Sequence, residues 1–164
     1  MDKVEIIDVK DNVLSENEVE AEKVRTLLKE KNVFQINLMS SPGSGKTTLL
    51  CSLIPLLTKR GYQVSVLEAD IDGDVDAHTI LEKTDAKSVQ LHTMGACHLT
   101  AQMTYDALRK VDLDNADVVF LENVGNLVCP AEFDTGSDLN MMLLSVPEGD
   151  DKPLKYPLMF KVSN

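Results

Sequence analysis

The stretch Ser40-Ser41-Pro42-Gly43-Ser44-Gly45-Lys46-Thr47-Thr48 decides the fold of this 164-residue chain. It follows an apolar run, residues 33–39, typical of a buried strand, and it precedes residues 47–60, where apolar side chains recur at helical spacing. Strand, glycine-containing loop and helix, in this order, form the setting in which the pattern G-x-x-x-x-G-K-[ST] binds phosphate. Ser40 replaces the first glycine of the pattern, whereas Gly45, Lys46 and Thr47 match it. We therefore predict a site for a nucleoside triphosphate with Mg²⁺.

Each residue type in this loop has a physical task. Glycines at positions 43 and 45 let backbone N–H groups approach phosphate oxygens closely. Lys46 is expected to neutralise charge on the β and γ phosphates, and the Thr47 hydroxyl to bind Mg²⁺. The alternative, a Gly-Ser turn with a solvated lysine, is disfavoured by the order of strand, loop and helix. The predicted nucleotide-binding residues are Gly43, Ser44, Gly45, Lys46, Thr47 and Thr48.

The rest of the chain alternates strand-like and helix-like segments. Ser15-Glu16-Asn17-Glu18 has the form of a capping box, so we expect an amphipathic helix from there to Lys31. Further strands are expected at residues 64–67, 88–91, 118–121 and 142–146, and further helices at 77–81 and 98–109. This alternation predicts an α/β fold, a mostly parallel sheet with helices on both faces. We divide the chain into an N-terminal helix, residues 1–32, packed on a nucleotide-binding domain, residues 33–164.

Acidic residues follow the strand predicted at residues 64–67, in the segment Glu68-Ala69-Asp70-Ile71-Asp72-Gly73-Asp74-Val75-Asp76. Ligands bind at the carboxyl ends of parallel strands, so a carboxylate here can reach the water shell of Mg²⁺ or orient the attacking water. Asp70 is the aspartate nearest to the strand end and is our candidate, whereas Asp72 and Asp74 are interpreted as a solvated acidic loop. The spacing also resembles a calcium loop, but it lacks the glycine and the final glutamate that such a loop requires.

A second strand ends in an acid at Val118-Val119-Phe120-Leu121-Glu122-Asn123-Val124-Gly125. This resembles the hydrolase signature of strand, acidic residue and switch glycine, with Glu122 in place of the commoner aspartate. Glu122 is expected to hold a water of Mg²⁺, and the Gly125 amide to sense the γ-phosphate. An ordinary strand and turn is the alternative, which the nearby phosphate loop disfavours. The predicted catalytic residues are Lys46, Asp70, Glu122 and Gly125, and the predicted Mg²⁺ ligands are Thr47, Asp70 and Glu122.

Two cysteines and a histidine form a candidate site for a transition metal. Cys97 and His98 are adjacent, and Cys129 comes four residues after Gly125. Thiolate and imidazole suit Zn²⁺ or Ni²⁺. Three ligands leave a four-coordinate site incomplete, and a two-fold dimer would supply more. Buried cysteines without a metal are the alternative, and Cys51 is interpreted in that way.

The charge of the chain limits its partners. Its formal net charge is −11, which argues against a general nucleic-acid binder because such proteins need a basic surface. No apolar run approaches the length of a membrane helix and the N-terminus lacks a secretory signal, so a cytoplasmic location is expected. The three cysteines do not suggest a disulfide framework in that compartment.

Several stretches together resemble one family of phosphate-loop (P-loop) NTPases. They are residues 40–50, Cys97-His98-Leu99, residues 122–130 (Glu-Asn-Val-Gly-Asn-Leu-Val-Cys-Pro) and residues 148–157 (Glu-Gly-Asp-Asp-Lys-Pro-Leu-Lys-Tyr-Pro). The chain is similar to the HypB-type GTPases that incorporate nickel into hydrogenase, from about residue 15 to residue 163. The resemblance implies a GTP-dependent homodimer that acts with a maturation partner on the hydrogenase large-subunit precursor. It also implies that Cys97, His98 and Cys129 bind nickel or zinc at the dimer interface.

The sequence departs from that family in four places. Ala69 stands where glycine is usual and Thr100 where an acid is common. The Cys-rich or His-rich N-terminal segment that binds nickel in some members has no counterpart in this sequence. The family continues past residue 164 into a strand and an N-K-x-D motif that reads guanine, so the sheet is expected to lack one strand or more. A truncated metal-binding dimerisation module with impaired catalysis is therefore an alternative. The remaining alternative is another P-loop NTPase, such as a urease-type nickel GTPase or a small-molecule kinase.

Overall fold

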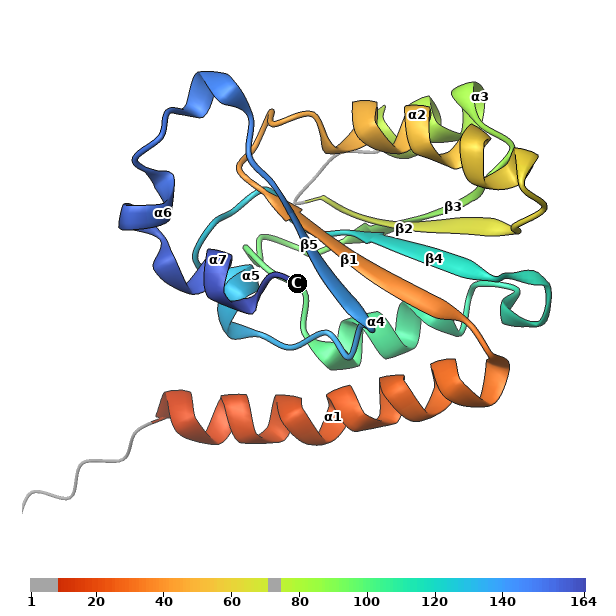
Figure 1. The fold of residues 1–164 in the computed structure, drawn as a ribbon. Helices are drawn as coiled ribbons and strands as arrows, with labels where there is room; N and C mark the ends of the chain where they lie inside the picture. The colour runs from red at the N-terminus through yellow and green to blue at the C-terminus, as the bar shows by residue number, and fades with distance from the viewer. Residues whose placement is uncertain (1–8, 71–74) are drawn as a thin grey trace, which may run out of the picture.

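A five-stranded parallel sheet with helices on both faces forms the fold, and this confirms the predicted α/β class (Figure 1). The computed structural model describes the backbone of residues 9–70 and 75–164, and the side chains of residues 12–70 and 78–164. The strands are β1 (Phe34–Ser40), β2 (Val64–Asp70), β3 (Lys87–His92), β4 (Val118–Glu122) and β5 (Leu139–Leu143). They lie in the order β3-β2-β4-β1-β5, and each neighbouring pair is parallel. The carboxyl ends of β2, β4 and β1 are therefore neighbours.

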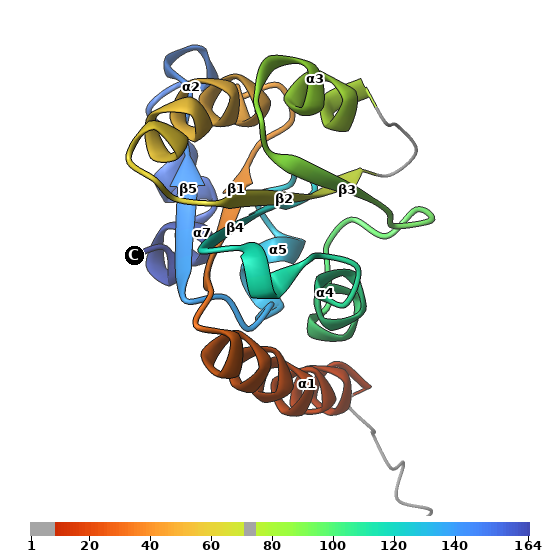
Figure 2. The same cartoon turned by 90° about the vertical axis from the view of Figure 1, so that its right-hand side faces the viewer.

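Helices cover the two faces of the sheet in pairs (Figures 1 and 2). Helices α2 (Lys46–Lys59) and α3 (Val75–Lys83) lie on one face, while α4 (Ala101–Leu108) lies on the other with α1 (Val9–Lys31) outside it. Successive strand residues point to opposite faces, so Phe120 packs with Leu50 of α2, and Leu121 packs with Leu108 of α4. None of the described helices is long and apolar enough to span a membrane.

Helix α1 begins at Val9, so the prediction that Ser15 caps it is wrong. Ser15 is exposed inside the helix, and no glycine or proline precedes it there to stop the helix. The polar residue with a fixed task is Asn17, which is buried. Its Nδ2 donates to the Asp134 carbonyl at 2.8 Å, and its Oδ1 accepts from the Ala101 backbone N–H at 2.8 Å. Asn17 thus ties α1 to the start of α4.

Other boundaries also differ from the predictions. Strand β2 runs to Asp70 instead of ending at residue 67, so Glu68 and Asp70 lie in the strand and not after it. Helix α4 begins at Ala101 because the Thr100 hydroxyl caps it by accepting from the Met103 N–H at 3.2 Å, which leaves His98 in the preceding turn. The last strand is β5 (Leu139–Leu143), three residues earlier than expected, and Val146 instead begins the 3₁₀ turn Val146–Glu148. The polar Asn140 obscured this strand in the sequence, although it pairs with Asn37 of β1.

After β4 and β5 the chain forms three short helices that were not predicted. They are α5 (Cys129–Glu132), α6 (Lys152–Lys155) and α7 (Pro157–Val162). Met159 of α7 is fully buried against Met39 of β1 and Leu127, the latter in the segment that leads to α5. The backbone N–H of Asn164 donates to the Asn140 carbonyl at 2.9 Å, so the end of the chain lies along β5.

Three asparagine side chains form a chain of hydrogen bonds across the sheet. Asn123, at the end of β4, donates to the Asn37 side chain of β1 at 3.0 Å. Asn37 donates to the Asn140 side chain of β5 at 3.0 Å, and Asn140 donates to the Val162 carbonyl of α7 at 3.2 Å. Asn37 and Asn123 are both 1% exposed. This asparagine row therefore satisfies polar groups inside the sheet, where an unpaired amide is costly.

Candidate functional site

The predicted phosphate loop joins the end of β1 to the start of α2. Gly43 has φ +71° and Gly45, the N-cap of α2, has φ +96°, a region that side chains other than glycine rarely adopt. The two glycines thus turn the chain so that the first N–H groups of α2 face the end of the sheet. Free N–H groups at a helix start are a ready anion-binding site.

Ser40 stands where the loop pattern has its first glycine, and the structure accommodates it. Ser40 is fully buried and does not have a positive φ, so the position does not require glycine. Its hydroxyl donates to the Ser41 carbonyl at 2.7 Å and accepts from Nζ of Lys46 at 2.9 Å. Lys46 is itself 9% exposed. The substitution therefore adds a polar anchor for the lysine expected to meet the phosphates.

The acidic residues predicted from two strand ends meet the loop at one cavity. Its volume is about 220 Å³, and it is lined by Pro42, Gly43, Lys46, Glu68, Ala69, Asp70, Glu122, Asn123, Val124 and Gly125. The Thr47 hydroxyl donates to Oε1 of the buried Glu122 at 3.0 Å. A hydroxyl and a carboxylate that converge beside a lysine match the oxygen ligands that Mg²⁺ uses in such sites.

The structure does not bring every predicted residue into this cavity. Ser44 faces the connection after β5, and Thr48 is exposed on the first turn of α2. Asp72 and Asp74, interpreted as a solvated loop, lie outside the described residues. Five lining residues were not predicted as site residues: Pro42, Glu68, Ala69, Asn123 and Val124. The acidic one, Glu68, is 2% exposed and lies directly opposite Glu122 in the β2–β4 register. The signal that could have found it is an acid that directly follows the apolar run Val66-Leu67 in the same strand.

Gly125 lies against the backbone of the phosphate loop. A Cβ added at Gly125 would be 2.8 Å from Cα and 2.9 Å from N of Pro42. The next residue continues the contact, because the Asn126 N–H donates to the Ser40 carbonyl at 2.9 Å. The segment after β4 is thus fitted to the loop, and only glycine leaves room for it.

Cys97, His98 and Cys129 come together in space, as the sequence suggests. The Sγ atoms of Cys97 and Cys129 are 2.9 Å apart, Cys97 Sγ is 3.7 Å from Nδ1 of His98, and the three ligand atoms lie within 4.8 Å of one another. We call this group the thiol cluster. Cys129 is the first residue of α5, and the His98 ring stacks on Phe133 with centroids 3.8 Å apart.

The electrostatics of the thiol cluster concern two of its members. Burial lowers the pKa of His98, while the charge of Glu132 acts in the opposite direction. The neutral imidazole, which this shift favours, is the form that binds metals. The pKa of the Cys129 thiol is raised, mainly by a hydrogen bond with Cys97 and to a smaller extent by burial. Outside the cluster, Cys51 packs with the α2 side of the core, which agrees with its predicted role as core.

Comparison with known proteins gives the chain a family. The family model described as "CobW/HypB/UreG, nucleotide-binding domain" matches residues 34–144, which contain the phosphate loop, both acidic strand ends and the thiol cluster. The chain belongs to the CobW/HypB/UreG family. Within that family its similarity is to the HypB proteins, as the sequence motifs indicate.

Three relatives define this HypB similarity. The "Hydrogenase/urease maturation factor HypB" of Helicobacter hepaticus is 48% identical over 158 residues, which cover 94% of the chain and 64% of that protein. The crystal structure of HypB from Helicobacter pylori in complex with nickel is 39% identical with a TM-score of 0.84, covering 90% of the chain and 69% of that structure. HypB from Archaeoglobus fulgidus is 35% identical with a TM-score of 0.82, covering 92% and 72%. The chain thus spans about two thirds of these HypB proteins.

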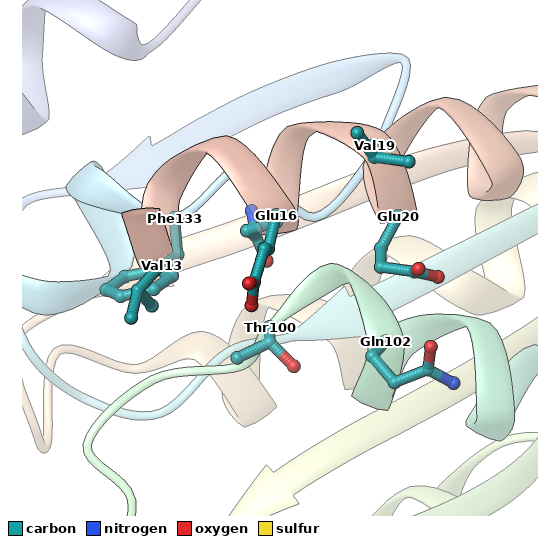
Figure 3. A pocket seen from close by; sticks show the side chains of 8 residues that line it. Val13, Glu16, Val19, Glu20, Thr100, Gln102 and Phe133 are labelled. Carbon is teal, nitrogen blue, oxygen red and sulfur yellow. The ribbon is translucent and has the colours of Figure 1, made fainter. Parts of the chain in front are cut away.

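A larger cavity lies away from the phosphate loop of this CobW/HypB/UreG domain. Its volume is about 460 Å³, and it is lined by Val13, Glu16, Asn17, Val19, Glu20, Thr100, Gln102 and Phe133. Figure 3 shows the side chains of α1 on one side of it and those of Thr100 and Gln102 on the other. It contains no residue predicted for nucleotide or metal binding. Its size alone therefore does not make it the functional site.

Proposed function

We propose that the chain is the nucleotide-binding part of a GTP-hydrolysing metallochaperone that assists nickel insertion into hydrogenase. The observation that carries the proposal is the short path from the phosphate loop to the thiol cluster. Gly125 contacts Pro42 of the loop, and Cys129 begins α5 four residues later. A nucleotide-sensing segment thus leads directly to a metal ligand.

In the proposed nucleotide site, each residue has one task. The N–H groups of the loop bind the phosphates, and Lys46 leaves its contact with Ser40 to neutralise the β and γ phosphates. Thr47 and Glu122 would hold Mg²⁺, which when bound spreads the negative charge of the phosphates. Asp70, at the end of β2, orients the water that attacks the γ-phosphate.

The proposed cargo of the thiol cluster is nickel, with zinc as the competing ion. Two thiols and an imidazole suit both metals, and affinity order alone rarely decides which is bound. The solved structure of the Helicobacter pylori relative contains nickel, which favours that ion here. Because three ligands leave coordination positions open, we propose that a second copy of the chain completes the site in a two-fold homodimer.

The coupling between the two sites is the central step of the proposal. Contact between Gly125 and a γ-phosphate moves the segment after β4, and Cys129 moves with it relative to Cys97. Metal affinity then differs between the GTP and GDP states, which allows nickel to be held and released. The proposed recipient is the hydrogenase large-subunit precursor, reached with a maturation partner; the names of the relatives, which are hydrogenase maturation factors, support the link to hydrogenase.

Calorimetric titration tests this function. The protein is titrated with non-hydrolysable GTP, GDP and ATP analogues plus Mg²⁺, with and without Ni²⁺. The expected result is binding selective for guanine, together with a nickel affinity that depends on the nucleotide. Binding indifferent to the base would contradict the GTPase assignment for this chain, and equal nickel affinity in both nucleotide states would remove the coupling.

A further inference from the structure

Glu148 joins the phosphate loop to the segment that follows β5. It ends the 3₁₀ turn Val146–Glu148, and a single carboxylate oxygen, Oε2, makes three contacts. This oxygen accepts from the Ser44 hydroxyl at 2.9 Å, from the Ser145 N–H at 2.7 Å and from the Ser145 hydroxyl at 2.6 Å. Ser44 and Glu148 are 104 residues apart in the chain. Figure 1 shows the blue connection after β5 passing beside the loop that precedes α2.

The carboxylate of Glu148 is held in its charged form. Burial alone would raise its pKa, but hydrogen bonds from the Ser145 hydroxyl, the Ser41 hydroxyl, the Ser145 N–H and the Ser44 hydroxyl lower the pKa of Glu148 to about 2. Ser41 and Ser44 both belong to the phosphate loop. A negative charge is therefore fixed beside the phosphate loop, on the side that faces the connection after β5.

The segment anchored by Glu148 packs, at its other end, against α5, the helix that begins with Cys129. It continues through α6 and α7, and Met159 of α7 is fully buried against Leu127. Ala131 of α5 packs against the same small core, and Cys129 begins that helix. A shift of α7 would therefore act on α5 by a path that does not pass through Gly125.

We propose that Glu148 is a positioning residue that clasps the phosphate loop to the α6–α7 segment and passes the nucleotide state to the thiol cluster. This inference rests on the proposed function, since it requires a nucleotide in the loop. Phosphate groups bound by the N–H groups of the loop repel the carboxylate of Glu148 on the neighbouring side of that loop. Binding of a triphosphate thus weakens the clasp, frees the start of the α6–α7 segment and changes the packing of Met159 beside α5.

The test compares Glu148→Gln with Asp150→Asn, both in a Cys51→Ser background so that only the cluster thiols react. Gln is isosteric with Glu but uncharged, and Asp150 is an exposed acid in the same connection. The rate of thiol modification by Ellman's reagent is measured with GDP and with a non-hydrolysable GTP analogue, and calorimetry gives the affinity for the analogue. In Glu148→Gln the ratio of the two rates should move toward one without reaching it, because the path through Gly125 remains. The affinity should rise about threefold or more, an effect that shrinks in 1 M salt because salt screens charges.

The outcomes distinguish a Glu148 that transmits the nucleotide state from a Glu148 that only supports the fold. A merely structural Glu148 would lower the nucleotide affinity on substitution, and a rate ratio unchanged in both Glu148→Gln and Glu148→Ala would overturn the clasp. Asp150→Asn should match the parent in both measurements. If the parent itself fails to bind nucleotide, the proposed function fails as well. If the parent shows a ratio different from one and the Glu148 variants keep it, only the clasp fails.

Discussion

Replacement of Gly125 by alanine should strain the backbone beside the phosphate loop and thereby weaken nucleotide binding. The added Cβ would lie 2.8 Å and 2.9 Å from two backbone atoms of Pro42, which cannot rotate away as a side chain can. Overpacking of this kind costs about 1–3 kcal/mol, and about 1.4 kcal/mol changes an equilibrium constant tenfold. If the Gly125 N–H must approach the γ-phosphate, the strain is largest in the triphosphate state. We expect the affinity for a non-hydrolysable GTP analogue to fall about tenfold or more, and the affinity for GDP to fall less.

Calorimetry of both nucleotides and urea unfolding measure these effects. The control is Gly61→Ala, in the turn after α2, where an added Cβ meets nothing within 4 Å but φ is +94°. That variant should lose about 1–2 kcal/mol of unfolding free energy from its left-handed backbone and should keep its nucleotide affinities. Wild-type stability and GTP-analogue affinity in Gly125→Ala would refute the argument that the segment after β4 is sterically fitted to the phosphate loop.

Further predictions concern the thiol cluster, α1 and the clasp. Cys129→Ser should weaken nickel binding more than about tenfold in competition with a chelating dye, as loss of a direct ligand requires, whereas Cys51→Ser should leave it unchanged. Gly136→Ala places a Cβ 2.6 Å from Cβ of Val24 in α1, so urea unfolding should show a loss of about 2 kcal/mol or more with nucleotide affinity retained; equal stability would contradict the close approach. The pKa of Glu148 is lowered in the folded protein from 4.5 to about 2, so its contribution to stability is present above pH 4.5 and is lost as the pH falls toward 2. The difference in unfolding free energy between the parent and Glu148→Gln should therefore shrink over that pH range, and a constant difference would show that the charge of Glu148 does not stabilise the fold.

Local sequence signals predicted the parts of the fold that depend on neighbouring residues. The phosphate loop, its flanking strand and helix, and the acid at the end of β4 follow from spacing and composition alone. The meeting of Cys97 with Cys129 was also predicted, although on a resemblance as well as on ligand chemistry. Boundaries failed where a local pattern had more than one reading, as at the capping box of Ser15, because α1 already begins at Val9 and Ser15 lies exposed inside it.

Contacts between distant segments could not be predicted in the same way. Glu148 touches Ser44 across 104 residues, and nothing in its own neighbourhood points to the phosphate loop. Strand β5 was misplaced because its asparagine is polar, and only the pairing with Asn37 explains how a polar residue fits there. Pattern reasoning reads one segment at a time, whereas these positions are set by two segments together.

The asparagine row has a consequence for how this sequence can vary. Asn37 uses its amide nitrogen toward one neighbour and its oxygen toward the other, so each side chain is matched to two partners at once. Replacing one asparagine by an apolar residue leaves a buried donor or acceptor of the neighbouring asparagine without a partner. This should lower the free energy of unfolding by about 1–3 kcal/mol. Replacing all three by apolar residues of similar size removes the mismatch among the side chains, and the remaining cost is the loss of their bonds to the Val162 carbonyl and the Val124 N–H. In evolution, or in a designed library, these three positions should therefore change as a set, and intermediates with one replacement should be the least stable members of the series.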